Sequence, residues 1–132
     1  MLKQKVVVDS YAWIEYFIGS EKGERVKKMI ENPSIDIITP SIVVAEVTSI
    51  TKREQRDVEE AYSHMTTNTQ IITLDAQQAR KVGEKHAEIR KTIKDFGMAD
   101  VIILMTAQSL NAKIITGDPH FKGMKEVSLF LE

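Results

Sequence analysis

Short apolar runs alternate with helical patterns along the whole chain, and this alternation restricts the fold more than any other feature. The apolar runs predict strands at residues 5–8, 35–38, 70–73 and 112–116, and a fifth, edge strand at residues 126–129. The intervening segments carry apolar residues at helical spacing. Strands separated by helices pair in parallel through right-handed crossovers. We therefore expect one α/β domain over residues 1–132, a three-layer α/β/α arrangement with a central parallel sheet of four to five strands.

The helical segments begin at residues that commonly start helices. We expect helices from residue 10, from residue 20 to about residue 32, and over residues 40–52, 54–65, 76–94 and 98–110. Ser10 and Asp75 are suited to capping helix N-termini, and Pro40 to a first helical position. Within residues 54–65, Val58, Ala61 and Tyr62 are expected to face inward. The segment 98–110 is unusually apolar, so we expect it to lie centrally.

Composition excludes several classes of protein. The 132 residues contain no cysteine, which excludes a disulfide framework, a thiolate zinc site and a cysteine nucleophile. No stretch approaches the ~18 apolar residues of a membrane span, and the first residues lack the apolar core of a signal peptide. We therefore expect a soluble, cytoplasmic protein with no membrane partner. The formal net charge of −1 argues against a protein that coats nucleic acid indiscriminately.

Four acidic residues lie where such a fold would gather carboxylates. Asp9 ends the first strand, Glu46 lies inside the helix 40–52, Asp100 opens the helix 98–110, and Asp118 follows the strand 112–116. Ligands of open α/β sheets bind beyond the carboxyl ends of the strands. Gathered carboxylates need a counter-charge, and Mg²⁺ takes oxygen ligands while keeping several waters. The pattern therefore suggests metal-assisted phosphodiester chemistry.

Each of these acids also has a simpler structural interpretation. Asp9 and Asp100 are placed to cap helices or occupy their first turns, and Asp118 to form a turn before Pro119. Glu46 is open to interpretation as a surface glutamate, although its neighbours are apolar. For the four acids together, we favour a common site over four separate structural roles.

Four sequence blocks carry a family resemblance. They are Val6–Phe17, Thr39–Val47, Gly97–Leu104 and Ile114–Phe121, and the last contains the pattern Thr-x-Asp-x-x-Phe. In this order they resemble the signature blocks of PIN-domain nucleases, most closely the VapC-type toxins of toxin–antitoxin pairs. The resemblance covers essentially the whole chain.

The resemblance implies a function and a set of site residues. It implies metal-binding acids at Asp9, Glu46, Asp100 and Asp118, with supporting hydroxyls at Ser10 and Thr116. It also implies one or two Mg²⁺ or Mn²⁺ ions, endonuclease cleavage of RNA, a cognate antitoxin protein and a homodimer. At position 11, where many members have serine or asparagine, this chain has tyrosine.

Other functions remain open at this stage. A PIN nuclease in RNA processing or quality control would have the same site, and a short neighbouring gene with a DNA-binding N-terminus would favour the toxin. A non-catalytic module that binds RNA or protein is opposed by the retention of all four acids. A phosphatase of the haloacid-dehalogenase type needs a second aspartate two residues after the first, where Tyr11 stands.

Several side chains outside the acid set have two interpretations. We interpret His120 as an exposed turn residue in preference to a catalytic one, and His64 and His86 as surface residues. Trp13 and Tyr16 form either an exposed aromatic patch or part of the core. The basic residues Lys52, Arg53 and Arg56 fit a solvated helix end better than a phosphate contact.

The sequence also offers candidate interfaces. For a homodimer these are the aromatic face around Trp13 and Tyr16, and the apolar positions near Val43 and Val58. For the antitoxin tail we expect a groove where Trp13 and Phe17 are available.

Overall fold

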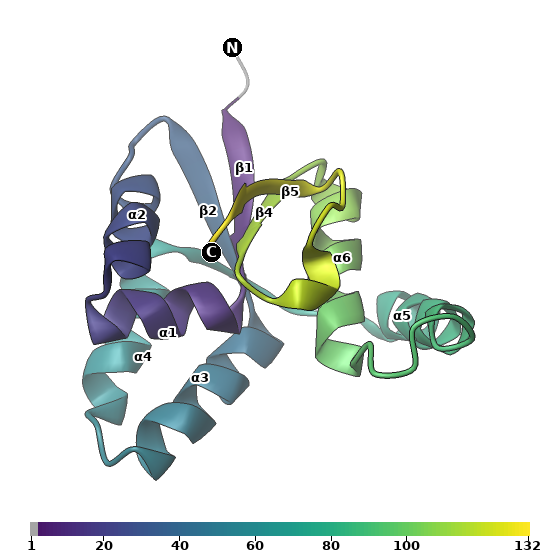
Figure 1. The fold of residues 1–132 in the computed structure, drawn as a ribbon, viewed down its shortest axis with the longest axis horizontal. Coiled ribbons are helices and arrows are strands. Elements are labelled where there is room, and N and C mark those ends of the chain that lie inside the picture. The colour runs from purple at the N-terminus through teal and green to yellow at the C-terminus, as the bar shows by residue number, and fades with distance from the viewer. Residues whose placement is uncertain (1–2) are drawn as a thin grey trace.

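Five parallel strands form the centre of the protein in the computed structural model, which describes residues 3–132 (Figure 1). The strands are β1 (Gln4–Val8), β2 (Ile35–Pro40), β3 (Gln70–Ile72), β4 (Lys113–Thr116) and β5 (Val127–Phe130). They pair in parallel in the order β3-β2-β1-β4-β5. The predicted three-layer α/β/α class is confirmed. Met1 and Leu2, which the domain prediction also included, lie outside the described residues.

Helices cover both sides of this sheet, with α1 and α2 on one side and α5 and α6 on the other (Figure 1). They are α1 (Ser10–Ile18), α2 (Glu21–Ile30), α3 (Ser41–Arg53), α4 (Val58–Asn68), α5 (Ala76–Ile89), α6 (Met98–Leu110) and the 3₁₀ turn η1 (Pro119–Phe121). Among residues 3–132, no helix is both long and apolar enough to span a bilayer.

Two helix boundaries differ from the sequence prediction by four or five residues, each for a local reason. α4 begins at Val58 instead of Glu54, because Asp57 accepts the backbone N–H of Glu60 as an N-cap. α5 ends at Ile89 instead of Lys94. Beyond it, the N–H groups of residues 91 and 92 bond to carbonyls three residues back, which closes turns in place of further α-helix.

The direction in which the chain adds strands to the sheet changes at β1. β2 lies on one side of β1 and β4 on the other, so the chain leaves β1 and β4 at neighbouring positions on the same edge. Such switch points create a crevice beyond the carboxyl ends of the strands. Asp9 directly follows β1, and Asp118 lies two residues after β4.

The core is built around β1 and α6. Val6, Val7 and Val8 are fully buried, as expected for a central parallel strand covered on both faces. On α6, the buried residues include Val101, Ile103 and Leu104, which confirms the central position predicted for this helix. Tyr62 was predicted to face inward, but it is 52% exposed on α4.

Trp13 belongs to the core and not to a surface patch. It is fully buried, and its indole Nε1–H donates to Thr39 Oγ1 at 3.1 Å. Its ring stacks on Phe17 at 5.5 Å between centroids and meets the edge of Tyr16 at 5.2 Å. Of the two interpretations of this aromatic residue, the core one is correct because a partner for the indole N–H is available inside the protein.

A glycine allows α1 and α2 to cross closely. A Cβ built on Gly23 would lie 2.0 Å from the carbonyl oxygen of Glu15, a contact that neither backbone can relieve without moving. By contrast, a Cβ on Gly83, inside α5, would meet no atom within 4 Å among the described residues. The same substitution therefore has opposite expected effects at these two helical positions.

We predict that Gly23→Ala lowers the free energy of unfolding by about 1–3 kcal/mol through overpacking. Gly83→Ala should raise it by roughly 0.5–1 kcal/mol, because alanine loses less backbone entropy than glycine on entering a helix. Urea unfolding followed by circular dichroism measures both changes. Equal stability of the two variants would contradict the proposed helix crossing.

Candidate functional site

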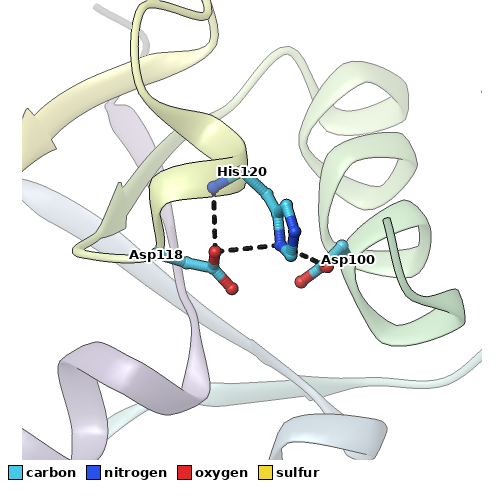
Figure 2. A group of neighbouring side chains, drawn as sticks. All are labelled: Asp100, Asp118 and His120. Atoms are coloured by element: carbon cyan, nitrogen blue, oxygen red, sulfur yellow. Dashed lines mark hydrogen bonds and ion pairs between the residues drawn. The ribbon is translucent and has the colours of Figure 1, made fainter. Parts of the chain in front are cut away.

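Two aspartates and one histidine meet beyond the carboxyl end of β4 (Figure 2). Asp100 comes from the first turn of α6, and Asp118 and His120 from the η1 turn. His120 Nδ1 lies 3.2 Å from Asp100 Oδ2 and 3.1 Å from Asp118 Oδ1. One ligand atom from each residue lies within 4.8 Å of the others, a spacing suited to a shared cation.

Backbone hydrogen bonds orient both aspartates. Asp100 Oδ2 accepts the N–H of Gly97 at 3.1 Å, at the start of α6. Asp118 Oδ1 accepts the N–H of His120 at 2.9 Å. Its own N–H donates to Thr116 Oγ1 at 2.9 Å. Both carboxylates are therefore held in place by the protein itself.

Asp9 is the most deeply buried acid of the group, with 2% exposure. Its Oδ1 accepts the N–H of Ala12 at 2.9 Å, so Asp9, and not Ser10 as predicted, is the N-cap of α1. Its Oδ2 accepts a hydrogen bond from the Thr116 hydroxyl. Burial raises the pKa of Asp9 to about 7, and the charges of Asp118 and Asp100 add to this rise.

Thr116 connects the first acid to the last. The family resemblance implied a supporting role for its hydroxyl. In the structure the hydroxyl accepts the N–H of Asp118 and also donates to Asp9. Thr116 is fully buried at the end of β4, so one side chain fixes both carboxylate-bearing segments.

Glu46 approaches the cluster from α3. Its Oε1 is buried and has no hydrogen-bond partner among residues 3–132. Burial raises the pKa of Glu46; a side-chain hydrogen bond with Ser10 opposes this shift, and the charges of Asp100 and Asp118 reinforce it. Glu46 is therefore not a solvent-exposed surface glutamate. The charges of Asp100 and Asp118 raise its pKa, as they raise the pKa of Asp9.

His120 is the site residue that sequence reasoning missed. Its side chain is only 26% exposed, and its Nε2 lies 3.1 Å from Asp95 Oδ2. Its ring packs edge-to-face against buried Phe96, at 5.5 Å. The hydrogen bond with Asp95 is the main cause that raises the pKa of His120. The sequence signal that could have identified His120 was its position two residues after Asp118, since the η1 turn places both residues side by side.

Tyr11, the departure from the family pattern, supports the loop that carries Asp118. Its ring packs so closely over Gly117 that a Cβ there would lie 2.1 Å from a ring carbon. Its hydroxyl accepts a hydrogen bond from Lys22 Nζ at 3.0 Å. Tyr11 therefore acts by packing against the loop between Thr116 and Asp118.

The three basic residues after Glu46 separate in space. Arg53 lines a depression on α3 together with Ala45, Glu46, Ser49 and Ile50. Its Nε donates to the Ser49 carbonyl at 3.3 Å. Arg56 instead donates to the Phe17 carbonyl, at 3.4 Å. Arg53 thus shares a surface depression with Glu46, an acid of the candidate site.

The donor set fits a hard divalent cation. Burial is the main cause that raises the pKa values of Asp9, Glu46 and Asp100, and each of these acids also feels the negative charge of Asp118. A cation bound by carboxylate oxygens would relieve both costs. The buried Glu46 oxygen, which lacks a partner among the described residues, is consistent with such a ligand.

The PIN domain family model matches residues 6–127. Among curated proteins, none matches the sequence.

Solved structures of similar fold include three from bacteria. A toxin–antitoxin complex from Klebsiella pneumoniae has 23% identity and a TM-score of 0.67, covering 92% of this chain and 94% of that chain. VapBC2 from Rickettsia felis, bound to a promoter DNA fragment, has 20% identity and a TM-score of 0.69, covering 98% of each chain. VapC20 from Mycobacterium tuberculosis, a sarcin–ricin loop cleaving toxin, has 16% identity and a TM-score of 0.70, covering 92% and 98%. At these identities the similarity establishes a shared fold.

The raised pKa of Asp9 predicts a pH-dependent stability of the metal-free protein. A carboxyl with a higher pKa in the folded state stabilises that state below its unfolded pKa, and this contribution is lost as pH rises through the folded pKa. Since the pKa of Asp9 rises from 3.8 to about 7, the free energy of unfolding should fall between about pH 4 and pH 7. Asp9 alone contributes a slope of roughly 1.4 kcal/mol per pH unit at most.

Asp9→Asn should flatten this profile, because the amide does not ionise. Glu46, Asp100 and His120 contribute in the same direction, since their pKa values are also raised, so a residual slope is expected. Urea unfolding at several pH values in the presence of a chelator provides the measurement. A wild-type stability that increases from pH 4 to pH 7 would contradict the raised pKa of Asp9.

Proposed function

The chain belongs to the PIN domain family, and on this basis we propose that it is a metal-dependent endoribonuclease that acts as the toxin of a toxin–antitoxin pair. The observation that carries this proposal is the gathering of Asp100, Asp118 and His120 beyond β4. Asp9 and Glu46 lie near enough for the charges of Asp100 and Asp118 to raise their pKa values. The family match removes the haloacid-dehalogenase-type phosphatase from the alternatives.

We assign the binding of Mg²⁺ or Mn²⁺ to Asp9, Glu46, Asp100 and Asp118. When bound, such a cation activates water and neutralises charge on the attacked phosphate. The protein contributes orientation: Thr116 aligns Asp9 and the Asp118 backbone, and the Gly97 N–H aligns Asp100. Ser10 steadies Glu46 from the first turn of α1. The reaction class is hydrolysis of RNA phosphodiester bonds.

The toxin role draws support from the solved structures of similar fold. One is a toxin–antitoxin complex, and another is a toxin that cleaves the sarcin–ricin loop. We accordingly propose a cytoplasmic protein whose partners are an RNA substrate, a cognate antitoxin and a second copy of itself.

The interfaces expected from the sequence need correction. Trp13 and Val43 are fully buried, so neither is available to an antitoxin tail or a second copy. The large hydrophobic side chains that are exposed within residues 3–132 are Ile18, Tyr62, Ile93 and Met98. These side chains, together with the partly exposed Tyr16, Phe17 and Val58 of the predicted interfaces, remain available for the apolar part of a homodimer or antitoxin contact.

The decisive test is Asp100→Asn. RNA cleavage should fall on the order of 100-fold or more, because the variant removes a charge from the cation site while preserving the shape of the side chain. A chelator should abolish wild-type cleavage, and added Mg²⁺ or Mn²⁺ should restore it. The readout is fragment formation from total RNA on a denaturing gel.

Asp36→Asn is the matched control for this test. Asp36 lies in β2, where its half-exposed carboxylate pairs with Lys3 at 3.5 Å, and its replacement should leave cleavage unchanged. Full activity of Asp100→Asn would reject the proposed site. No cleavage by the wild-type protein under any metal condition would instead favour a non-catalytic binding module.

The position of Arg53 predicts a role in substrate binding. Since it shares a depression with Glu46, a phosphate next to the cleaved bond would lie within reach of its guanidinium. Arg53→Gln should raise KM roughly tenfold at low salt, the loss of one charge-assisted hydrogen bond, with a smaller change in kcat. It should also reduce the salt dependence of RNA binding.

Lys52→Gln is the control, because Lys52 is an exposed cation on the same turn that does not line the depression. Filter binding of a short RNA at several salt concentrations measures the effect. Equal losses of RNA affinity in the two variants would mean that binding depends on the total positive charge and not on the position of Arg53.

A further inference from the structure

The imidazole of His120 lies between two carboxylates in an arrangement that the acids alone do not explain (Figure 2). Nδ1 is 3.2 Å from Asp100 Oδ2 and 3.1 Å from Asp118 Oδ1. Atoms at adjacent positions around an octahedral ion with ligand distances of about 2.1 Å are themselves about 3 Å apart. The two separations therefore match ligand atoms that share one small cation.

The opposite ring nitrogen fixes which atom can act as a ligand. Nε2 lies 3.1 Å from Asp95 Oδ2. An ionised carboxylate only accepts, so Nε2 carries the hydrogen. A carboxylate that accepts the second N–H is the usual companion of a metal-binding histidine, because it sets the tautomer and the ring orientation.

Nδ1 itself makes no ordinary hydrogen bond. It is buried, and within residues 3–132 no acceptor or donor meets it with suitable angles, despite the two short distances. A hydrogen on Nδ1 would need an aligned acceptor, and a lone pair would need a donor or a cation. Because Asp100 and Asp118 cannot donate when ionised, a cation suits all three atoms.

We propose that His120 Nδ1 is a ligand of the divalent cation, that Asp95 is the positioning residue for its ring, and that this nitrogen donor favours Mn²⁺ over Mg²⁺. The inference rests on the proposed metal-dependent function and specifies its metal site. Mg²⁺ strongly prefers oxygen ligands and retains its waters. Imidazole suits transition metals better than it suits Mg²⁺. Mn²⁺ prefers carboxylate oxygens but, unlike Mg²⁺, also accepts a nitrogen ligand, so a mixed carboxylate and imidazole set favours Mn²⁺ over Mg²⁺.

Pulsed electron paramagnetic resonance of bound Mn²⁺ tests the inference directly. The wild-type protein should show ¹⁴N modulation from a directly bound imidazole. His120→Gln should lose this modulation and should bind Mn²⁺ roughly tenfold more weakly, while its Mg²⁺ affinity changes less. His86→Gln is the matched control, since His86 lies on α5 outside the cluster, and it should behave as wild type.

Two variants of Asp95 test its part. Asp95→Ala should weaken Mn²⁺ binding by roughly 10- to 100-fold and reduce the ¹⁴N modulation, because the ring loses its orienting partner. Asp95→Asn should retain most of both, since the amide oxygen still accepts the Nε2 hydrogen. Thermal unfolding of every variant establishes that each is folded. Unchanged modulation in Asp95→Ala would overturn the positioning role.

The outcomes separate this inference from the function on which it rests. Bound Mn²⁺ without ¹⁴N modulation in the wild-type protein would show that His120 turns away from the ion. That result would overturn the inference and leave the metal-dependent nuclease intact. An absence of Mn²⁺ and Mg²⁺ binding in the wild-type protein would overturn both.

Discussion

The carboxylate of Asp9 is the point on which the fold and the candidate site both depend. It ends β1, caps α1 through the Ala12 N–H, and accepts the hydroxyl of Thr116 at the end of β4. Burying an ionised carboxylate is costly unless hydrogen bonds or opposite charge compensate. Here two hydrogen bonds offset part of the cost of burying the charge. The pKa of Asp9 is still raised, so part of this cost remains. Under the proposed function, a bound cation would supply the remaining compensation, and the cost of burial would become affinity for metal.

The remaining acids reach this point because of the sheet order. With β1 and β4 adjacent and parallel, their carboxyl ends emerge side by side, and α6 packs against both strands. Asp100 and Asp118 therefore approach Asp9 from separate segments, close enough to raise its pKa. The arrangement requires no irregular backbone at the acids, so the candidate site can be distributed over a regular α/β fold.

The sequence predicted this frame well because its signals are periodic or lie at strand ends. Asp9 and Asp118 follow apolar strands, and the unusually apolar segment that Asp100 opens predicted a central helix. His120 escaped prediction since its role depends on Asp95, a partner far along the chain whose approach no local pattern encodes. Trp13 was ambiguous for a similar reason: whether an indole is buried depends on a distant acceptor, here Thr39. Tertiary pairing of polar groups is thus what the sequence alone does not reveal.

The two sides of the site differ in how firmly they are held. Asp9 and Thr116 are buried and fixed by backbone and side-chain hydrogen bonds. Asp95 is 82% exposed in its side chain, so water competes for its bond to His120 and the imidazole is held less tightly. In the proposed site, the rigid side would determine where a cation sits, because its oxygens are fixed. The exposed side would add a nitrogen donor that depends on one solvent-accessible contact, so a small change in sequence there would alter metal preference without disturbing the core.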